Sequence, residues 1–368
     1  MPHLFDPLPI RGLTLPNRIV VSPMCQYSAH DGVPNEWHLV HLGSRAVGGA
    51  GLVLSEATAV VPEGRISPED LGLWNETQQA GFARITAFVR AQGAAAGVQL
   101  AHAGRKASTW RPWSGQGAVP EERGGWVPVA PGATPFAPGF AVPRAMTHAD
   151  IDAVVTAFGD AARRAGDAGF EVVEVHAAHG YLLHEFLSPL SNTRDDEYGG
   201  SFENRIRFLV RVVDRVRAVW PERLPLFVRV SVSDWSEGGW DLAQSIELSR
   251  CLAQAGVDLV DCSSGGNVPS ASIPLGPGYQ TPFAAEIRRQ AGVLTGAVGL
   301  ITSAAQADHI VRSGQADCVL LARAMLRDPY WPLHAAEELG QVVGWPAPYL
   351  RAAPPGAPVR TAQVSSDR

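Results

Sequence analysis

Eight times along this chain, a short apolar segment rich in β-branched residues is followed by a longer segment with helical periodicity. The apolar segments are the expected strands, at 19–24, 51–58, 97–102, 172–177, 226–231, 259–264, 293–299 and 318–323. The segments that follow them are the expected helices, at 36–47, 77–91, 147–168, 203–219, 242–255, 282–291, 303–312 and 330–339. Such alternation predicts an α/β protein with a parallel sheet, and eight is a number of strands at which the sheet closes. We therefore expect a single (β/α)8 TIM barrel.

Two segments depart from this repeat. Residues 103–145 are rich in Gly and Pro, contain three tryptophans and are too long for a simple connection between a strand and a helix. We expect this excursion to cap the barrel mouth. We assign residues 1–340 to the barrel domain and 341–368 to a Pro-rich C-terminal tail, which we expect to be loosely attached beyond Arg351.

Several helix ends carry recognisable capping residues. Thr147 is an expected N-cap, as is Thr302 or Ser303, because their side-chain oxygens can accept from the first free N–H groups of a helix. Gly256 and Gly314 stand where helices should end.

The charge balance excludes several classes of function. Thirty Lys and Arg against thirty-six Asp and Glu give a net charge of −6, and no basic run is present that could bind a row of phosphates, so we expect no nucleic-acid partner. Lys106 is the only lysine, and it follows Arg105 rather than Gly, which excludes a Walker A loop. A Schiff-base enzyme would have to use Lys106.

The cysteines and the apolar segments indicate a cytoplasmic protein. Cys25, Cys251, Cys262 and Cys318 lie far apart and form no CxxC, so neither a zinc cluster nor a disulfide framework is expected. Only Cys25 lies at a strand end, where a chemical role is expected. The first residues are broken by prolines, unlike a signal peptide, and no apolar stretch is long enough to span a membrane.

In a barrel of this type the chemistry lies at the C-terminal ends of the strands, and these positions are unusually polar here. In strand order they are Ser22, Pro23, Met24 and Cys25; Glu56 and Ala57; Gln99 and His102; His176, His179 and Tyr181; Arg229; Ser263 and Ser264; Gly299; and Ala322 and Arg323. We expect them to line one site.

Two of these positions indicate anion binding. Gly299 and Arg323 follow the seventh and eighth strands, where barrels often bind phosphate. Arg229 lies within an apolar strand and must have a partner, because an unpaired buried charge is costly. A structural ion pair with Glu174 or Asp261 and a functional role facing an anionic ring or carboxylate both remain open.

The histidines after the fourth strand allow more than one chemistry. His176 and His179 could be structural, could donate to a substrate oxygen, or could join His102 in a metal site of a barrel hydrolase. Tyr181 could donate a proton in a site that excludes water. No G-x-S-x-G is present for a serine hydrolase, and no G-x-G-x-x-G follows a strand.

Four runs spread over nearly the whole chain carry specific motifs. They are LFDPLPIRGLTLPNRIVVSPMCQYS, GVQLAHAGRKAS, EVHAAHGYLLHEFLSPLSNTRDDEYGGSFENRIRF and LLARAMLRDPYWP. The run H-A-A-H-G-Y followed by S-P-L-S-N and D-E-Y-G-G-S-x-E-N-R is highly specific. In these runs the chain resembles the Old Yellow Enzyme family of FMN-dependent ene-reductases, in its thermophilic-like branch.

The resemblance implies a non-covalently bound FMN, with NADPH or NADH as the hydride donor. It implies that the FMN is bound by Ser22, Pro23, Met24, Cys25, Ala57, Gln99, Arg229, Gly299, Ala322 and Arg323. Within that set, Cys25 would tune the flavin potential, Arg229 would lie beside the pyrimidine edge of the ring, and Gly299 and Arg323 would lie at the phosphate.

The resemblance also implies residues on the substrate side. His176 and His179 would bind the oxygen of the activating group, Tyr181 would be the proton donor, and Tyr27 would contact substrate. Arg351 in the run PAPYLR would reach the site of a neighbouring subunit, in a homodimer or homotetramer.

The implied activity is reduction of the C=C bond of an α,β-unsaturated carbonyl or nitro compound. Hydride would come from flavin N5, and the resemblance implies protonation by Tyr181. The alternatives from other classes are the metal-dependent hydrolase with His102, His176 and His179, and the Schiff-base lyase with Lys106. No bound metal is expected under the flavin hypothesis.

Overall fold

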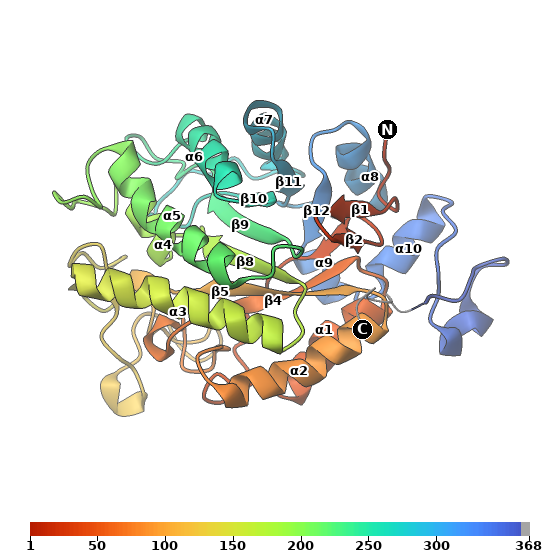
Figure 1. The fold of residues 1–368 in the computed structure, drawn as a ribbon, viewed down its shortest axis with the longest axis horizontal. Coiled ribbons are helices and arrows are strands. Elements are labelled where there is room, and N and C mark those ends of the chain that lie inside the picture. The colour runs from red at the N-terminus through yellow and green to blue at the C-terminus, as the bar shows by residue number, and fades with distance from the viewer. Residues whose placement is uncertain (362–368) are drawn as a thin grey trace.

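The computed structural model describes residues 1–361, and it contains a closed barrel of parallel strands surrounded by helices (Figure 1). The strand order around the barrel is β10-β11-β12-β3-β4-β5-β8-β9, with each neighbouring pair parallel. The strands are β3 (Ile19–Val21), β4 (Leu52–Ala59), β5 (Ala95–Ala101), β8 (Val172–Ala177), β9 (Leu226–Ser231), β10 (Leu259–Ser263), β11 (Leu294–Ala297) and β12 (Cys318–Leu321). The expected TIM barrel is confirmed.

The outer helices follow these strands in the expected order. They are α1 (Glu36–Val47), α2 (Glu76–Ala91), α3 (His148–Asp167), α5 (Phe202–Val219), α6 (Leu242–Gln254), α7 (Thr281–Ala291), α8 (Ala304–Arg312) and α10 (Trp331–Glu338). Thr147 and Ser303 cap α3 and α8 by accepting from the backbone three residues on. Gly256 and Gly314 follow the ends of α6 and α8 with positive φ values of 89° and 71°, as their expected positions require.

Three strands end two or more residues earlier than predicted. The first ends at Val21 rather than residue 24, the seventh at Ala297 rather than 299, and the eighth at Leu321 rather than 323. Each of these strands ends shortly before a residue proposed for the site. The proposed residues therefore lie in loops above the barrel rather than in the hydrogen-bonded strands. A residue in such a loop can turn its backbone toward a ligand.

The sequence analysis did not predict a β-hairpin that closes the other end of the barrel. Strands β1 (Leu8–Ile10) and β2 (Leu13–Leu15) pair antiparallel across a two-residue turn. Their buried leucine and isoleucine side chains pack with the barrel interior, including Val20, Phe227 and Leu259. The hairpin is therefore the apolar plug of the N-terminal end.

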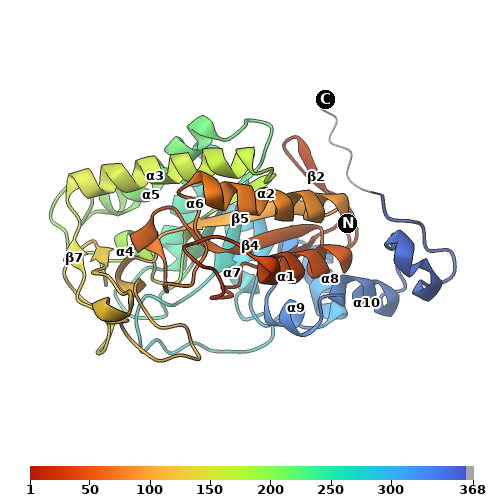
Figure 2. The same ribbon diagram turned by 90° about the horizontal axis from the view of Figure 1, so that it is seen from below.

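The excursion 103–145 contains little regular structure and lies beside the mouth (Figure 2). It includes η2 (Gly104–Lys106), η3 (Glu121–Arg123) and a short parallel pair, β6 (Val129–Ala130) with β7 (Arg144–Ala145). The ring of Trp113 meets that of Tyr27 edge to face at 5.8 Å. This contact agrees with the expected capping position.

The C-terminal tail is better attached than predicted within the described residues. After η4 (Ala347–Ala352) the chain returns, Trp345 forms a β-bridge with Val359, and Arg360 Nη1 donates to the carbonyls of Ala46 and Val47 at 3.0 and 2.9 Å. These bonds attach residues 358–360 to the barrel domain, so the expected loose attachment is wrong for these three residues. Residues 362–368 lie outside the described part. The division into a domain 1–340 and a tail 341–368 stays a prediction.

Candidate active site at the barrel mouth

The structure brings nearly all predicted site residues to the C-terminal ends of the strands. Ser22, Pro23, Met24, Cys25 and Tyr27 follow β3; Ala57 and Gln99 lie on β4 and β5; His176 lies on β8, with His179 and Tyr181 in the turn after it; Arg229 lies on β9; Gly299 follows β11; and Ala322 and Arg323 follow β12. Arg351 is the exception, because it is exposed on η4 in a segment that projects from the side of the barrel (Figures 1 and 2).

Three rings form the centre of the site. The ring centroids of His176 and His179 lie 5.1 Å apart at 85°, and those of His176 and Tyr181 lie 5.1 Å apart at 80°. The backbone N–H of Ala178 donates to His176 Nδ1 at 3.3 Å, which places the imidazole proton on Nε2. His179 Nε2 lies 2.7 Å from Ser263 Oγ. Two imidazoles and a phenol thus lie close together at the C-terminal end of β8.

The electrostatic environment keeps all three rings neutral. Burial, followed by the positive charge of Arg229, holds the pKa values of His176 and His179 well below the ordinary histidine value. Burial raises the pKa of the Tyr181 phenol well above its ordinary value. At neutral pH the histidines are uncharged N–H donors and the tyrosine keeps its proton, so the group can stabilise a developing negative charge and can supply a proton.

Beneath these rings, Arg229 is held in a buried charge cluster. Its Nε lies 2.9 Å from Asp261 Oδ2, and its Nη1 donates to Ser22 Oγ at 3.3 Å. Gln99 Nε2 donates to Glu174 Oε1 at 2.8 Å. Burial raises the pKa values of both Glu174 and Asp261, and the positive charge of Arg229 opposes both shifts. The structural ion pair with Asp261 is therefore present, and the same guanidinium also reaches the loop after β3.

A β-bulge positions the loop that carries the cysteine and the tyrosine. The register of β4 against β5 shifts between Ser55 and Ala57, which leaves Glu56 as the extra residue. Glu56 Oε2 accepts from the backbone N–H of Gln26 at 2.7 Å, and its Oε1 lies 3.4 Å from His38 Nε2. The bulge was not predicted, because an extra residue leaves no mark in the apolar pattern of the strand.

Cys25 and Tyr27 are protonated in this loop. Burial raises the pKa of the Cys25 thiol well above its ordinary value, and the carboxylates of Asp70 and Glu56 raise it further. The pKa of Tyr27 is also raised, mainly by burial. Cys25 is thus a neutral thiol rather than a thiolate nucleophile, and Tyr27, at φ 51°, turns its ring toward Trp113.

A cavity of about 240 Å³ opens between the loops after β10, β11 and β12. Ser263, Gly299, Ala322 and Arg323 are among its lining residues. Gly299 has φ 118°, and a Cβ there would lie 2.8 Å from Gln280 Nε2, so the chain needs glycine at this point. A guanidinium group beside a glycine turn with accessible backbone N–H groups provides the hydrogen-bond donors that a phosphate group requires.

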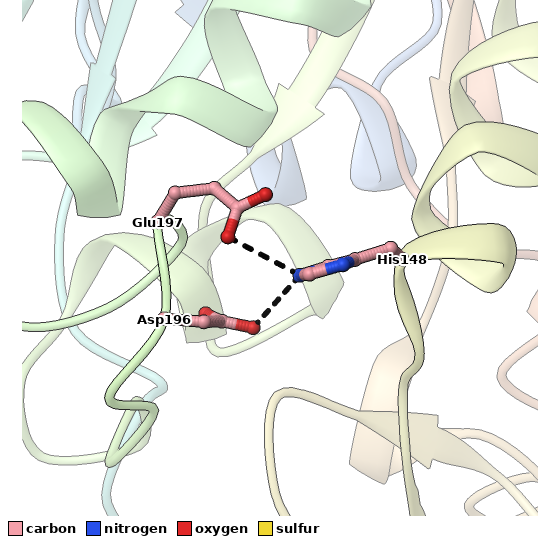
Figure 3. Close-up of side chains that lie close together, drawn as sticks. All are labelled: His148, Asp196 and Glu197. Atoms are coloured by element: carbon pink, nitrogen blue, oxygen red, sulfur yellow. Dashed lines mark hydrogen bonds and ion pairs between the residues drawn. The ribbon is translucent and has the colours of Figure 1, made fainter.

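Another group of possible metal ligands lies on the surface, at the N-terminal end of α3 (Figure 3). His148 Nε2 lies 3.1 Å from Asp196 Oδ2 and 3.3 Å from Glu197 Oε2. Within residues 1–361, this is the only group of three or more such ligands whose atoms lie within 4.8 Å of one another. Asp196 is already paired with Arg194. His102, His176 and His179 do not form such a group, so the geometry does not support the hydrolase alternative.

Comparisons with known proteins show the family to which the chain belongs. Residues 3–341 match the model of the NADH:flavin oxidoreductase / NADH oxidase family, which covers most of the chain. The chain belongs to this family. The NADPH dehydrogenase of Geobacillus thermodenitrificans is 51% identical over 350 residues, with 95% of this chain and 98% of the relative covered.

Solved structures of family members have the same fold. Morphinone reductase in complex with tetrahydroNAD is 28% identical with a TM-score of 0.77, and each chain is covered to 100%. The Old Yellow Enzyme homologue of Zymomonas mobilis is 30% identical with a TM-score of 0.76, with 92% of this chain and 93% of that chain covered. The expected Old Yellow Enzyme type, and with it the fold, is confirmed.

The flavin oxidoreductase is FMN-dependent and takes hydride from a reduced nicotinamide nucleotide. Its residues fit FMN, because the 240 Å³ cavity with Arg323 and Gly299 lies at one side of the mouth and the buried Arg229 at the floor. Family membership sets aside both the hydrolase and the lyase alternatives. No helix in the described part of the chain is long and apolar enough to cross a membrane.

Proposed function

We propose that this flavin oxidoreductase is an ene-reductase that uses NADPH to reduce the C=C bond of α,β-unsaturated carbonyl or nitro compounds. The observation that carries the proposal is the ring group of His176, His179 and Tyr181, with two neutral imidazoles and a protonated phenol at one point of the mouth. An oxygen-bearing activating group needs hydrogen-bond donors, and the adjacent carbon needs an acid.

FMN, when bound, supplies hydride transfer at its N5 atom. We assign its binding to Ser22, Pro23, Met24, Cys25, Ala57, Gln99, Arg229, Gly299, Ala322 and Arg323. Arg229 would hold a fixed positive charge beside the pyrimidine edge, where Asp261 keeps the guanidinium in place. Arg323 and the backbone at Gly299 would bind the phosphate, and the neutral thiol of Cys25 would adjust the potential without adding a charge.

On the substrate side, His176 and His179 would donate hydrogen bonds to the carbonyl or nitro oxygen and draw electron density from the β-carbon. Tyr181 would then give its proton to the α-carbon. Tyr27 would contact the substrate from the loop after β3. Because Tyr27 packs on Trp113, we infer that the excursion 103–145 helps to determine which alkenes fit.

The exposed position of Arg351 supports a shared site. It lies on η4, in a segment that projects from the barrel (Figure 2). We infer that Arg351 reaches the mouth of a neighbouring subunit in a homodimer or homotetramer. The four free cysteines agree with a reducing, cytoplasmic location, which we also infer.

The test is a visible spectrum of the purified protein during anaerobic addition of NADPH and then 2-cyclohexenone. We expect a flavin band that bleaches with NADPH and returns with the enone. A flavin that bleaches but does not respond to the enone, or to a nitroalkene, would refute the substrate class and leave the family assignment intact.

A further inference from the structure

Lys106, the only lysine of the chain, binds backbone carbonyl groups of two loops that form the proposed substrate site. It lies on η2, at the start of the excursion, and its Nζ donates to the carbonyl oxygens of His179 at 2.8 Å and Gly266 at 2.6 Å. The first carbonyl belongs to the turn after β8 and the second to the loop after β10. One ammonium group therefore joins two neighbouring loops of the mouth.

The two loops meet through their backbones, and both have a positive φ value at the meeting point. His179 has φ 62°, in the left-handed region that costs free energy for a residue with a Cβ, and Gly266 has φ 90°. A Cβ on Gly180 would lie 2.2 Å from Gly266 O, so the loops have no room for a side chain between them. Two carbonyl dipoles directed at one point repel each other unless a cation lies between them. Lys106 supplies that cation.

The surroundings of Lys106 stabilise its positive charge. Its Nζ lies 4.3 Å from the centroid of the Phe136 ring and 5.4 Å from that of Tyr181, both within the range of cation–π attraction. Burial lowers the pKa of Lys106 to about 8, and Glu185 opposes this shift. The amine is thus mainly protonated at pH 7, and its charge helps to lower the pKa values of His176 and His179.

We propose that Lys106 is a positioning residue that holds His179 in its left-handed conformation and so fixes the imidazole at the angle needed to bind a substrate oxygen. The inference rests on the proposed function, because it assumes that His179 binds this oxygen. It assigns no substrate contact to Lys106 itself.

The experiment compares wild type with Lys106→Met, which keeps the length and removes the donors, and Lys106→Arg, which keeps the charge and the donors. NADPH-treated holoenzyme is mixed anaerobically with 2-cyclohexenone in a stopped-flow instrument, and the half-saturating concentration and limiting rate of flavin reoxidation are measured. Two charge-assisted hydrogen bonds are lost, so we expect Lys106→Met to raise the half-saturating concentration about tenfold or more, and Lys106→Arg to stay within about threefold.

The matched control is Arg105→Met. Arg105 is the neighbouring cation of η2, and its Nη2 donates to the Asn267 carbonyl at 2.8 Å rather than to His179. FMN content should be unchanged in every variant. If Lys106→Met does not retain FMN, Lys106→Gln replaces it, with the same expected rise, because its amide is shorter and uncharged.

Two results would overturn the inference. One is a half-saturating concentration within twofold of wild type in Lys106→Met or its replacement. The other is an equal rise in Arg105→Met, which would indicate general loosening of the loops. If instead wild type is not reoxidised by 2-cyclohexenone, the proposed function fails, so the two failures are distinguishable.

Discussion

Removing the Tyr181 hydroxyl should slow the alkene half-reaction alone. In Tyr181→Phe the ring that packs 5.1 Å from His176 is retained, so the fold and the FMN site should not change. Burial keeps the wild-type phenol protonated. General acid catalysis contributes about 100-fold to 10,000-fold in enzymes, and we expect a loss of at least about 100-fold for the reaction with 2-cyclohexenone.

The two half-reactions are measured separately by anaerobic stopped-flow absorbance of the flavin. Bleaching by NADPH should stay within about twofold of wild type, because it needs no acid at the α-carbon. Tyr330→Phe is the control, since its hydroxyl lies 3.5 Å from that of Tyr349 outside the mouth. Equal losses in both half-reactions would refute the role of Tyr181 as the proton donor, and a loss of less than about tenfold with the enone would show that another group protonates the α-carbon.

Three further outcomes are expected. Cys25→Ala should shift the flavin midpoint potential in a redox titration while FMN stays bound; an unchanged potential would remove that role. Arg351→Ala should raise the KM for the enone, because Arg351 is proposed to reach the site of a neighbouring subunit. An unchanged KM would contradict this role and leave the tail with a structural role only. Burial lowers the pKa of His41 to about 3, so as the pH falls protons bind this histidine in the unfolded chain first. Lowering the pH from 6.5 to 5 should therefore reduce the unfolding free energy, measured by guanidinium titration, by about 2 kcal/mol less in His41→Gln than in wild type; an equal reduction in both proteins would refute this role of His41.

Much of the fold was predictable because it depends on patterns that are local in sequence. Strands such as Val172–Ala177 and Leu226–Ser231 are short apolar runs that are buried in the barrel, and both were predicted with the correct bounds. The Thr147 cap was predictable for the same reason, since its hydrogen bond spans three residues. The family motifs then placed the site residues at the strand ends.

The remaining features depend on contacts between distant parts of the chain. The β1–β2 hairpin is stabilised by the barrel interior, and its prolines and short strands conceal it in the sequence. Glu56 could be recognised as polar, but not as the side chain that accepts from Gln26. Arg360 lies in a Pro-rich run typical of disorder, yet the carbonyls at the end of α1 hold it in place. Lys106 was noted only as a Schiff-base alternative, because its partners are backbone atoms.

The β1–β2 hairpin stabilises the barrel with residues that take no part in catalysis. The chemistry is confined to one end of the barrel, and the apolar hairpin seals the other. Substitutions that improve heat tolerance can therefore be sought in the hairpin without altering selectivity. The loops at the mouth, in turn, can diverge toward new alkenes while the sealed end keeps the barrel folded.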